Sequence, residues 1–199
     1  MTKETQQEEK RRLRRLLLEK RRSLTAAEIE GKSQKIADYF MAWAGYQQSQ
    51  TIMLYLAMPD EAQTDLLLSD ALRQGKRVCV PLLGEKYGEM AAAEITTVDD
   101  LIVGKFGLKA PDPNKAKIID PSEIDLVVVP AVVFDRRGNR IGMGAGYYDR
   151  FLAKVRPDSR LLGLAWACQV VDSVPSEEHD MQVQQLLTEE GFFACGKVK

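Results

Sequence analysis

Short apolar runs alternate with amphipathic stretches along most of the chain. Four runs are rich in aliphatic and β-branched residues, as is typical of strands buried on both faces of a sheet: TIMLYLA (51–57), RVCVPLL (77–83), IDLVVVPAVVF (124–134) and RLLGLAWA (160–167). Four other segments have apolar residues at helical spacing: 10–22, 25–43, 63–74 and 146–155. Strands that alternate with helices predict a single α/β domain over residues 1–199, with three α/β/α layers and a largely parallel central sheet.

Residue types mark several boundaries of these elements. Thr25 and Glu28 form a T-x-x-E capping box, which predicts the start of the second helix. Gly75 suits the position after the helix over 63–74, and Gly138 suits a turn that needs a positive φ. Residues 84–116 have the least regular pattern, with weak strand signals near 90–102. The pattern after the polar loop at 174–180 fits either a helix or a strand.

The first predicted helix, KRRLRRLLLEKRR, is strongly basic, and the polar residues 1–9 before it are expected to be frayed. Four leucines share one stripe: Leu13, Leu16, Leu17 and Leu24. Lys10, Arg14 and Arg21 border this stripe, whereas the other arginines point further outward. One interpretation is a solvated basic face. The alternative is that these three cations project into a cleft that holds an anion.

The segment RIGMGAGYYDRFL (140–152) places glycines at 142, 144 and 146 immediately before a predicted helix. It lacks the Lys-Ser/Thr pair of a P-loop, and Tyr147 stands where a dinucleotide fingerprint needs its third glycine. Bare backbone N–H groups at a helix N-terminus still bind anions well. A tight turn that requires glycine is the alternative. Arg140 and Arg150 on either side favour phosphate.

Several polar residues are candidates for chemistry, each with a plainer interpretation. Asp149 either complements the helix dipole or holds Mg²⁺ beside a phosphate. Asp180 either forms a structural pair with His179 or supplies a second carboxylate to the metal. Glu61 follows the first strand, where it is either solvated or close to a substrate. Tyr147 and the neighbouring Tyr148 either join the core or stack on a flat heterocycle.

Composition narrows the class of protein. The 199 residues carry a net charge of −1, which gives no argument for nucleic acid or an anionic membrane. No apolar run is long enough for a membrane span, and the charged N-terminus does not resemble a signal peptide. The three cysteines are far apart and support neither a zinc site nor a disulfide framework. We therefore expect a cytoplasmic protein, and a monomer because no coiled coil or self-pairing edge is apparent.

A longer stretch is more specific than any of these features. VPAVVFDRRGNRIGMGAGYYDRFL, preceded by IDLVV, resembles the signature of the 5-formyltetrahydrofolate cyclo-ligase family. The resemblance extends over nearly the whole chain. It includes the N-terminal K-x-x-L-R of residues 10–14, the segment YLAMPDEAQT (55–64) and the segment GLAWACQVVDSVPSEEHD (163–180), in the family's order.

The resemblance implies an ATP- and Mg²⁺-dependent ligase. In this family ATP phosphorylates the formyl oxygen of 5-formyltetrahydrofolate, and N10 then attacks the activated carbon. Phosphate leaves, so that the products are 5,10-methenyltetrahydrofolate, ADP and phosphate. Such phosphoryl transfer needs cations, a backbone cradle and Mg²⁺ more than a protein nucleophile. The folate is expected with or without a polyglutamate tail.

The resemblance also assigns residues. Lys10 and Arg14 correspond to contacts with the ATP phosphates. Further nucleotide contacts are implied along the glycine segment: Ile141, Gly142, Met143, Gly144, Ala145, Gly146, Tyr147, Tyr148 and Asp149. The folate contacts that it implies are Leu56, Glu61, Gly144, Ala145, Gly146, Tyr147 and Tyr148. It makes Asp149 and Asp180 the Mg²⁺ ligands. Arg140 joins the ATP contacts on its charge and position alone.

Two positions depart from the family pattern. Ala110 precedes Pro111 where relatives often have glutamate. Ala145 occupies the middle of the glycine loop, where relatives often have glycine or lysine. Alanine is small enough for close approach of a ligand but supplies no cation, so Arg140 or Arg150 would have to replace a lysine there.

Two other functions remain as alternatives. A regulatory module that senses a sugar phosphate would bind its ligand without consuming ATP. A nucleic-acid-binding helix at 10–22 would show steep salt dependence, although its leucine stripe and the near-zero net charge of the chain argue against it.

Overall fold

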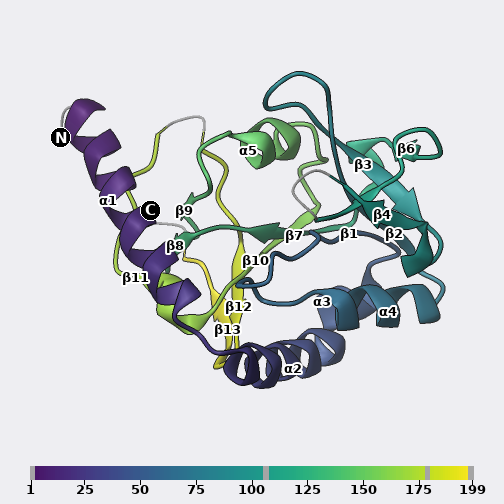
Figure 1. Ribbon diagram of the computed structural model, residues 1–199, viewed down its shortest axis with the longest axis horizontal. Coiled ribbons are helices and arrows are strands. Elements are labelled where there is room, and N and C mark those ends of the chain that lie inside the picture. Colours follow the sequence, from purple (N-terminus) through teal and green to yellow (C-terminus); the bar gives the residue numbers. More distant parts are fainter. Residues whose placement is uncertain (1–2, 105–107, 178–179, 197–199) are drawn as a thin grey trace.

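The computed structural model describes residues 3–104, 108–177 and 180–196 as helices packed around one large sheet (Figure 1). Three helices cover one face of the sheet: α2 (Ala26–Ala42), α3 (Ala44–Gln48) and α4 (Asp65–Arg73). The short helix α5 (Tyr147–Leu152) lies on the opposite face, and α1 (Lys3–Arg22) runs along one end of the molecule. This arrangement confirms the predicted α/β fold.

The central sheet has eight strands in the order β13-β12-β10-β7-β1-β2-β3-β6. Its strands are β1 (Thr51–Met53), β2 (Arg77–Leu83), β3 (Met90–Ile95), β6 (Lys117–Ile119), β7 (Leu126–Pro130), β10 (Arg160–Leu164), β12 (Gln185–Thr188) and β13 (Gly191–Ala194). The neighbours from β12 through β2 are parallel, whereas the outer pairings of β13, β3 and β6 are antiparallel. Parallel strands place their carboxyl ends at one edge, which is where ligands bind in such sheets.

The long apolar run 124–134 is two strands rather than the single predicted one. After Pro130 the chain leaves the large sheet, since proline has no N–H with which to extend the ladder. The side-chain amide of Gln169 then donates to the carbonyls of Ala131 and Val132, both at 2.9 Å. The chain continues into a separate three-stranded sheet of β8 (Val133–Asp135), β9 (Arg140–Ile141) and β11 (Val170–Val171). β9 leads directly into the glycine segment.

Helix α1 packs on this small sheet. Leu13 and Leu17 are buried against Val132, Val133 and Ile141. Leu16 was predicted to share their stripe, but its side chain is 40% exposed. The helix begins at Lys3 rather than Lys10. The expectation that residues 1–9 are frayed is therefore wrong for residues 3–9, which continue the helix.

The predicted boundaries hold at several points. Thr25 and Glu28 form both hydrogen bonds of the capping box. Gly75 has φ 70° and Gly138 has φ 85°. A Cβ at position 138 would lie 2.1 Å from the carbonyl oxygen of Val183, so only glycine fits this turn. Strand β1 ends at Met53, earlier than the predicted run 51–57.

The irregular segment 84–116 contains small elements. These are β3, the 3-10 turn η1 (Val98–Asp100), and a two-stranded sheet of β4 (Leu101–Val103) and β5 (Lys109–Pro111). Two further 3-10 turns are η3 (Pro121–Glu123) and η4 (Ala167–Gln169). The C-terminal segment forms strands, so the strand alternative was correct there. In the described ranges, no helix combines the length and apolar character needed to span a bilayer.

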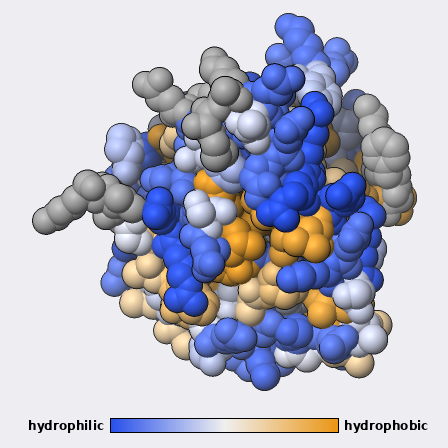
Figure 2. Space-filling view, turned by 90° about the vertical axis from the view of Figure 1, so that its left-hand side faces the viewer, coloured by the Kyte–Doolittle hydropathy of each residue, from blue (hydrophilic) through white to orange (hydrophobic). Residues whose placement is uncertain are grey.

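The two faces of the sheet have separate cores. On one face, Ile36 and Phe40 of α2 pack with Leu67 of α4. On the other face, Phe151 and Leu152 of α5 are buried against the strands. The second core fixes α5, and α5 in turn fixes the end of the glycine segment. Figure 2 shows the end of the molecule where α1 lies, which is mainly hydrophilic around a small hydrophobic patch.

Candidate active site

The glycine segment forms an open loop between β9 and α5. Gly144 has φ 102° and Gly146 has φ 64°, a region that L side chains rarely adopt. Gly146 is also the N-cap of α5. Gly144 and Met143 are exposed, whereas Ala145 is half-buried. Two of the three glycines are therefore required by backbone conformation, and the exposed side of the loop is free of large side chains at Gly144.

Arg14 of α1 lies against this loop. Its Nε donates to the carbonyl oxygen of Gly142 at 2.9 Å. A Cβ at Gly144 would be 3.7 Å from an Arg14 terminal nitrogen, so the guanidinium lies beside that glycine. Burial, together with repulsion from Arg11, lowers the pKa of Arg14, and no described carboxylate pairs with it. Arg14 is thus a half-buried cation at the mouth of the loop without a counter-ion among the described residues, as an anion site requires.

Lys10, one turn earlier on α1, has a different environment. Its Nζ donates to Glu177 at 3.1 Å and to Asp180 at 2.8 Å. Burial alone would lower the pKa of Lys10, but its hydrogen bonds to Asp180 and Glu177 outweigh that effect, and the pKa is raised. Lys10 therefore ties α1 to the segment that carries one of the predicted metal ligands.

Asp149, the other predicted metal ligand, is held from two sides. Its Oδ1 accepts from Arg140 at 2.6 Å and from the backbone N–H of Met181 at 3.2 Å. The second contact brings Asp149 to the backbone next to Asp180, whose own carboxylate accepts from Lys10. In the part of the chain that the structure describes, no group of three or more metal-ligating side chains occurs. His179 lies outside the described residues.

Arg140 lies behind the loop rather than at its open side. Its side chain is only 4% exposed, and burial lowers its pKa although Asp149 opposes that effect. Its Nε finds no hydrogen-bond partner among the described residues. This position does not support a direct contact with phosphate and indicates instead that Arg140 orients Asp149.

Glu61 follows β1 at the carboxyl edge of the sheet, as expected. One of its carboxylate oxygens accepts from Arg21 at 3.0 Å and the other from the backbone N–H of Met58 at 2.9 Å. Burial raises the pKa of Glu61, while Met58 and Arg21 act against that rise. Leu56 is half-buried on the same segment. Arg21 therefore contacts carboxylates of the chain itself, contrary to the hypothesis that it projects into a cleft that holds a bound anion.

Tyr148 lies between the glycine loop and Glu61. Burial raises its pKa, and the nearby charge of Glu61 adds to that rise. Its hydroxyl is buried and, of all the described groups, none hydrogen-bonds to it. A buried polar atom normally has a partner, so this hydroxyl is available to a ligand that reaches below the loop.

The sequence reasoning missed the turn between β2 and β3. Arg150 donates its Nε to the carbonyl of Gly88 at 2.9 Å and also bonds to the carbonyl of Ala145, which ties the glycine loop to this turn. Arg150 is thus held by backbone carbonyls. The ring of Tyr87, on the same turn, lies 6.0 Å from that of Tyr147. Gly88, with φ 86°, was the available sequence signal, because a Cβ there would collide with Arg150.

Comparisons with known proteins identify the family of the chain. A family model described as the 5-formyltetrahydrofolate cyclo-ligase family matches residues 6–189. The 5-formyltetrahydrofolate cyclo-ligase of Mus musculus is 30% identical over 192 residues, covering 91% of this chain and 94% of the relative. That of Escherichia coli is 28% identical over 179 residues, covering 87% and 96%.

Solved structures show the same fold. The NMR structure of Aquifex aeolicus 5,10-methenyltetrahydrofolate synthetase superposes with a TM-score of 0.82 at 28% identity, covering 96% of this chain and 94% of the other. A 5,10-methenyltetrahydrofolate synthetase from Mycoplasma pneumoniae, at 23% identity and a TM-score of 0.73, covers 90% of this chain and 98% of the other and supports the fold alone. The chain therefore belongs to the 5-formyltetrahydrofolate cyclo-ligase family, a family of ligases.

Proposed function

We propose that the chain converts 5-formyltetrahydrofolate and ATP to 5,10-methenyltetrahydrofolate, ADP and phosphate. The formyl oxygen takes the γ-phosphoryl group of ATP and ADP leaves. N10 of the folate then attacks the formyl carbon, and phosphate leaves as the ring closes. The reaction needs no protein nucleophile, which agrees with a site built of cations, carboxylates and bare backbone.

The observation that carries this proposal is the position of Arg14. A half-buried guanidinium without a carboxylate partner lies beside Gly144, at a loop with exposed backbone. Both features favour a phosphate, because guanidinium and backbone N–H groups form charge-assisted hydrogen bonds to its oxygens. We place the ATP phosphates there, with Lys10 as the second cation and residues 141–149 as the cradle.

The two carboxylates fit Mg²⁺. Asp149 and Asp180 would supply hard oxygen ligands, and the Asp149 carboxylate contacts the N–H of Met181, the residue that follows Asp180. When bound, Mg²⁺ neutralises charge on the phosphates. Arg140 acts in this proposal through Asp149, by holding its carboxylate in place.

We place the folate on the other side of the glycine loop, near Leu56 and Glu61. The Glu61 carboxylate accepts N–H groups of the reduced pterin ring, and the hydroxyl of Tyr148 provides a buried donor. Tyr147 and the loop residues 144–148 lie between the two ligands. Ala145 supplies no cation to either ligand, and its carbonyl is bonded to Arg150.

The direct test is an absorbance assay for the methenyl product. Purified chain is mixed with 5-formyltetrahydrofolate, with ATP and Mg²⁺ present, and with each left out in turn. We expect product only in the complete mixture, with ADP formed in equal amount. Product without ATP, or none at all, would overturn the proposal, and binding without ATP consumption would favour a sensor.

We also propose that residues 1–199 form one catalytic unit, which acts as a monomer in the cytoplasm. Cys79, Cys168 and Cys195 are free thiols, as is usual in a reducing compartment. Light scattering of the active chain measures its mass and tests the monomer, and cell fractionation tests the location.

A further inference from the structure

Arg21, in the last turn of α1, is the most deeply buried charged residue next to the proposed folate side. Its side chain is 1% exposed. It donates Nε and a terminal nitrogen to the two oxygens of Asp60, at 2.9 and 3.2 Å, and its other terminal nitrogen to Glu61 at 3.0 Å. This fork-shaped contact is specific to arginine, because lysine has a single ammonium group. One guanidinium thus fixes two consecutive carboxylates.

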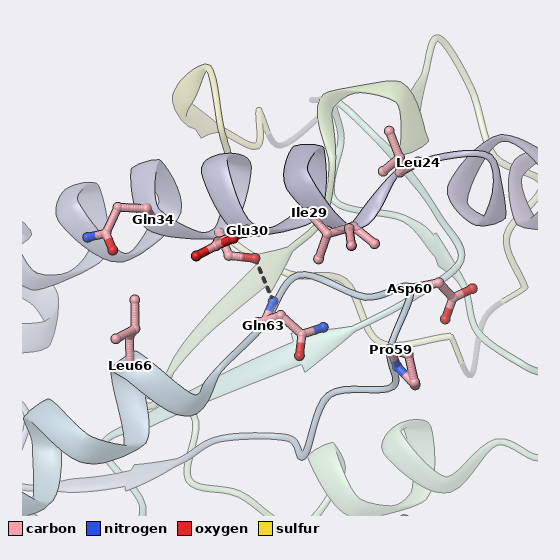
Figure 3. Close-up of a pocket in the computed structure, with 10 residues that line it drawn as sticks. Leu24, Ile29, Glu30, Gln34, Pro59, Asp60, Gln63 and Leu66 are labelled. Carbon is pink, nitrogen blue, oxygen red and sulfur yellow. Dashed lines mark hydrogen bonds between the residues drawn. The ribbon is translucent and has the colours of Figure 1, made fainter.

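The segment that carries these carboxylates borders a pocket on the side of α2, although Ala62 and Thr64 within it are buried. A cavity of about 680 Å³ lies between α2 and the segment 58–66 (Figure 3). In Figure 3, Ile29 and Leu24 line it from the α2 side, and Pro59 and Gln63 line it from the segment. An open cavity on that side leaves room for the segment to move outward unless polar contacts hold it.

Several hydrogen bonds of described groups tie the segment to the rest of the protein: the Tyr55 hydroxyl donates to the carbonyl of Ala62 and the Thr64 hydroxyl donates to the carbonyl of Tyr55, both at 2.7 Å. The backbone N–H of Gln63 donates to the Ser33 hydroxyl at 3.1 Å, and Trp166 Nε1 donates to the carbonyl of Asp60 at 3.0 Å. None of these contacts touches the carboxylate of Glu61. The only side chain that the structure shows bonded to this carboxylate is Arg21.

We propose that Arg21 is a positioning residue that holds the Glu61 carboxylate ionised and directed at the folate. This inference rests on the proposed function, in which Glu61 contacts the folate. In this proposal, Arg14 and Arg21 of the same helix serve different substrates. Arg14 has no carboxylate partner among the described residues and contacts ATP, whereas Arg21 acts on the folate through Glu61.

The charges around Glu61 support this role. Burial raises the pKa of Glu61, and the groups that face it are Arg21 from α1, Asp60 from its own segment, Tyr55 after β1 and Tyr148 from α5. Arg21 is the only cation among these groups. Its removal should raise the pKa of Glu61 further, whereas removal of the Asp60 charge should lower it.

The test compares Arg21→Gln with the unmodified enzyme. We expect the KM for 5-formyltetrahydrofolate to rise by about 10- to 100-fold, the size of a charge-assisted hydrogen bond, while the KM for ATP stays within about twofold. The acid limb of the kcat/KM profile for the folate should move to higher pH, because the loss of an adjacent positive charge raises the pKa of a carboxyl group. Isothermal calorimetry with 5-formyltetrahydrofolate alone should show the same loss of affinity.

A second variant distinguishes the positioning role from a merely structural effect of the substitution. Asp60→Asn disturbs the same cluster but removes a negative charge, so its acid limb should move to lower pH. A general loosening of the segment would shift the acid limbs of both variants, Arg21→Gln and Asp60→Asn, in the same direction or would shift neither of them. Arg21→Lys should keep the limb close to its normal pH while the folate KM still rises, and the exposed Arg15→Gln should behave as the unmodified enzyme.

The outcomes separate the inference from the proposed function. No ATP-dependent product from the unmodified chain would overturn both. An active chain in which Arg21→Gln keeps the folate KM and the acid limb would overturn the positioning role alone. If Arg21→Gln does not fold, the direction of the limb in Asp60→Asn decides: a shift to lower pH supports the inference, and no shift or a shift to higher pH overturns it.

Discussion

Replacing Arg14 by glutamine removes a positive charge from the mouth of the glycine loop without leaving a carboxylate unpaired. With the groups that the structure describes, Arg14 makes one hydrogen bond, to the carbonyl of Gly142 at 2.9 Å. Such a bond contributes about 1 kcal/mol, and the cost of burying the unpaired guanidinium offsets part of it. We therefore expect the free energy of unfolding to change by less than about 1 kcal/mol, and the melting midpoint by no more than about 4 °C.

The effect on ATP should be far larger. A charge-assisted contact to phosphate is worth about 1.5–3 kcal/mol, which corresponds to a loss of about 10- to 150-fold in affinity. Calorimetry with a non-hydrolysable ATP analogue measures this loss directly, and steady-state kinetics should show it in kcat/KM for ATP. The KM for the folate should change little.

Arg12→Gln is the matched control, because Arg12 lies on the same helix and, of the described groups, pairs with the nearby Glu9 at the surface. Unchanged nucleotide affinity in Arg14→Gln would refute the placement of the phosphates. Equal losses in both variants would show that the general charge of α1, rather than the position of Arg14, attracts ATP.

Three further substitutions follow from the site. Asp149→Asn should abolish most turnover and also lower the free energy of unfolding by about 3 kcal/mol, because Arg140 is left buried without its counter-charge. An unchanged free energy of unfolding, measured with denaturant, would contradict this expectation. Tyr148→Phe removes a buried hydroxyl that has no partner among the described residues. It should therefore raise the free energy of unfolding by about 1 kcal/mol while slowing catalysis. A less stable variant would argue against an unpaired hydroxyl. Burial places the folded-state pKa of Glu61 above its ordinary value of 4.5. As pH rises, the folded chain therefore keeps this proton to a higher pH than the unfolded chain does. The free energy of unfolding should fall as the pH rises from 4.5 through the folded-state pKa. Glu61→Gln should flatten this part of the stability–pH curve and weaken folate binding, and an unchanged slope in urea melts would rule out Glu61 as its origin.

Local features of the sequence predicted much of the fold. The capping box at Thr25 and the φ values of Gly75 and Gly138 depend on interactions within a few residues, so spacing and residue type were enough. The run 124–134 could not be divided in this way. Its apolar residues suit either sheet, and the side chain of Gln169, 38 residues from Ala131, takes the carbonyls after Pro130.

Within the site, the glycine segment likewise combines a feature that the sequence predicts with contacts that it does not predict. The sequence indicated an anion-binding loop because three alternating glycines before a helix leave the backbone bare. It gave no indication that Arg150 ties this loop to Gly88, a contact that spans 62 positions. It also placed Arg140 beside the phosphates, whereas packing buries Arg140 behind the loop and pairs it with Asp149.

The three cations that border the leucine stripe of α1 show most clearly what the sequence determines and what the tertiary structure adds. Helical periodicity by itself determined that Lys10, Arg14 and Arg21 face the protein, because that depends only on the 100° step of one helix. What each cation does depends on groups far along the chain: Lys10 meets Glu177 across 167 positions, Arg14 meets Gly142 across 128, and Arg21 meets Asp60 across 39. Only the tertiary structure decides which cation has a carboxylate and which has none, because a local pattern contains no information about partners that the sheet topology brings together.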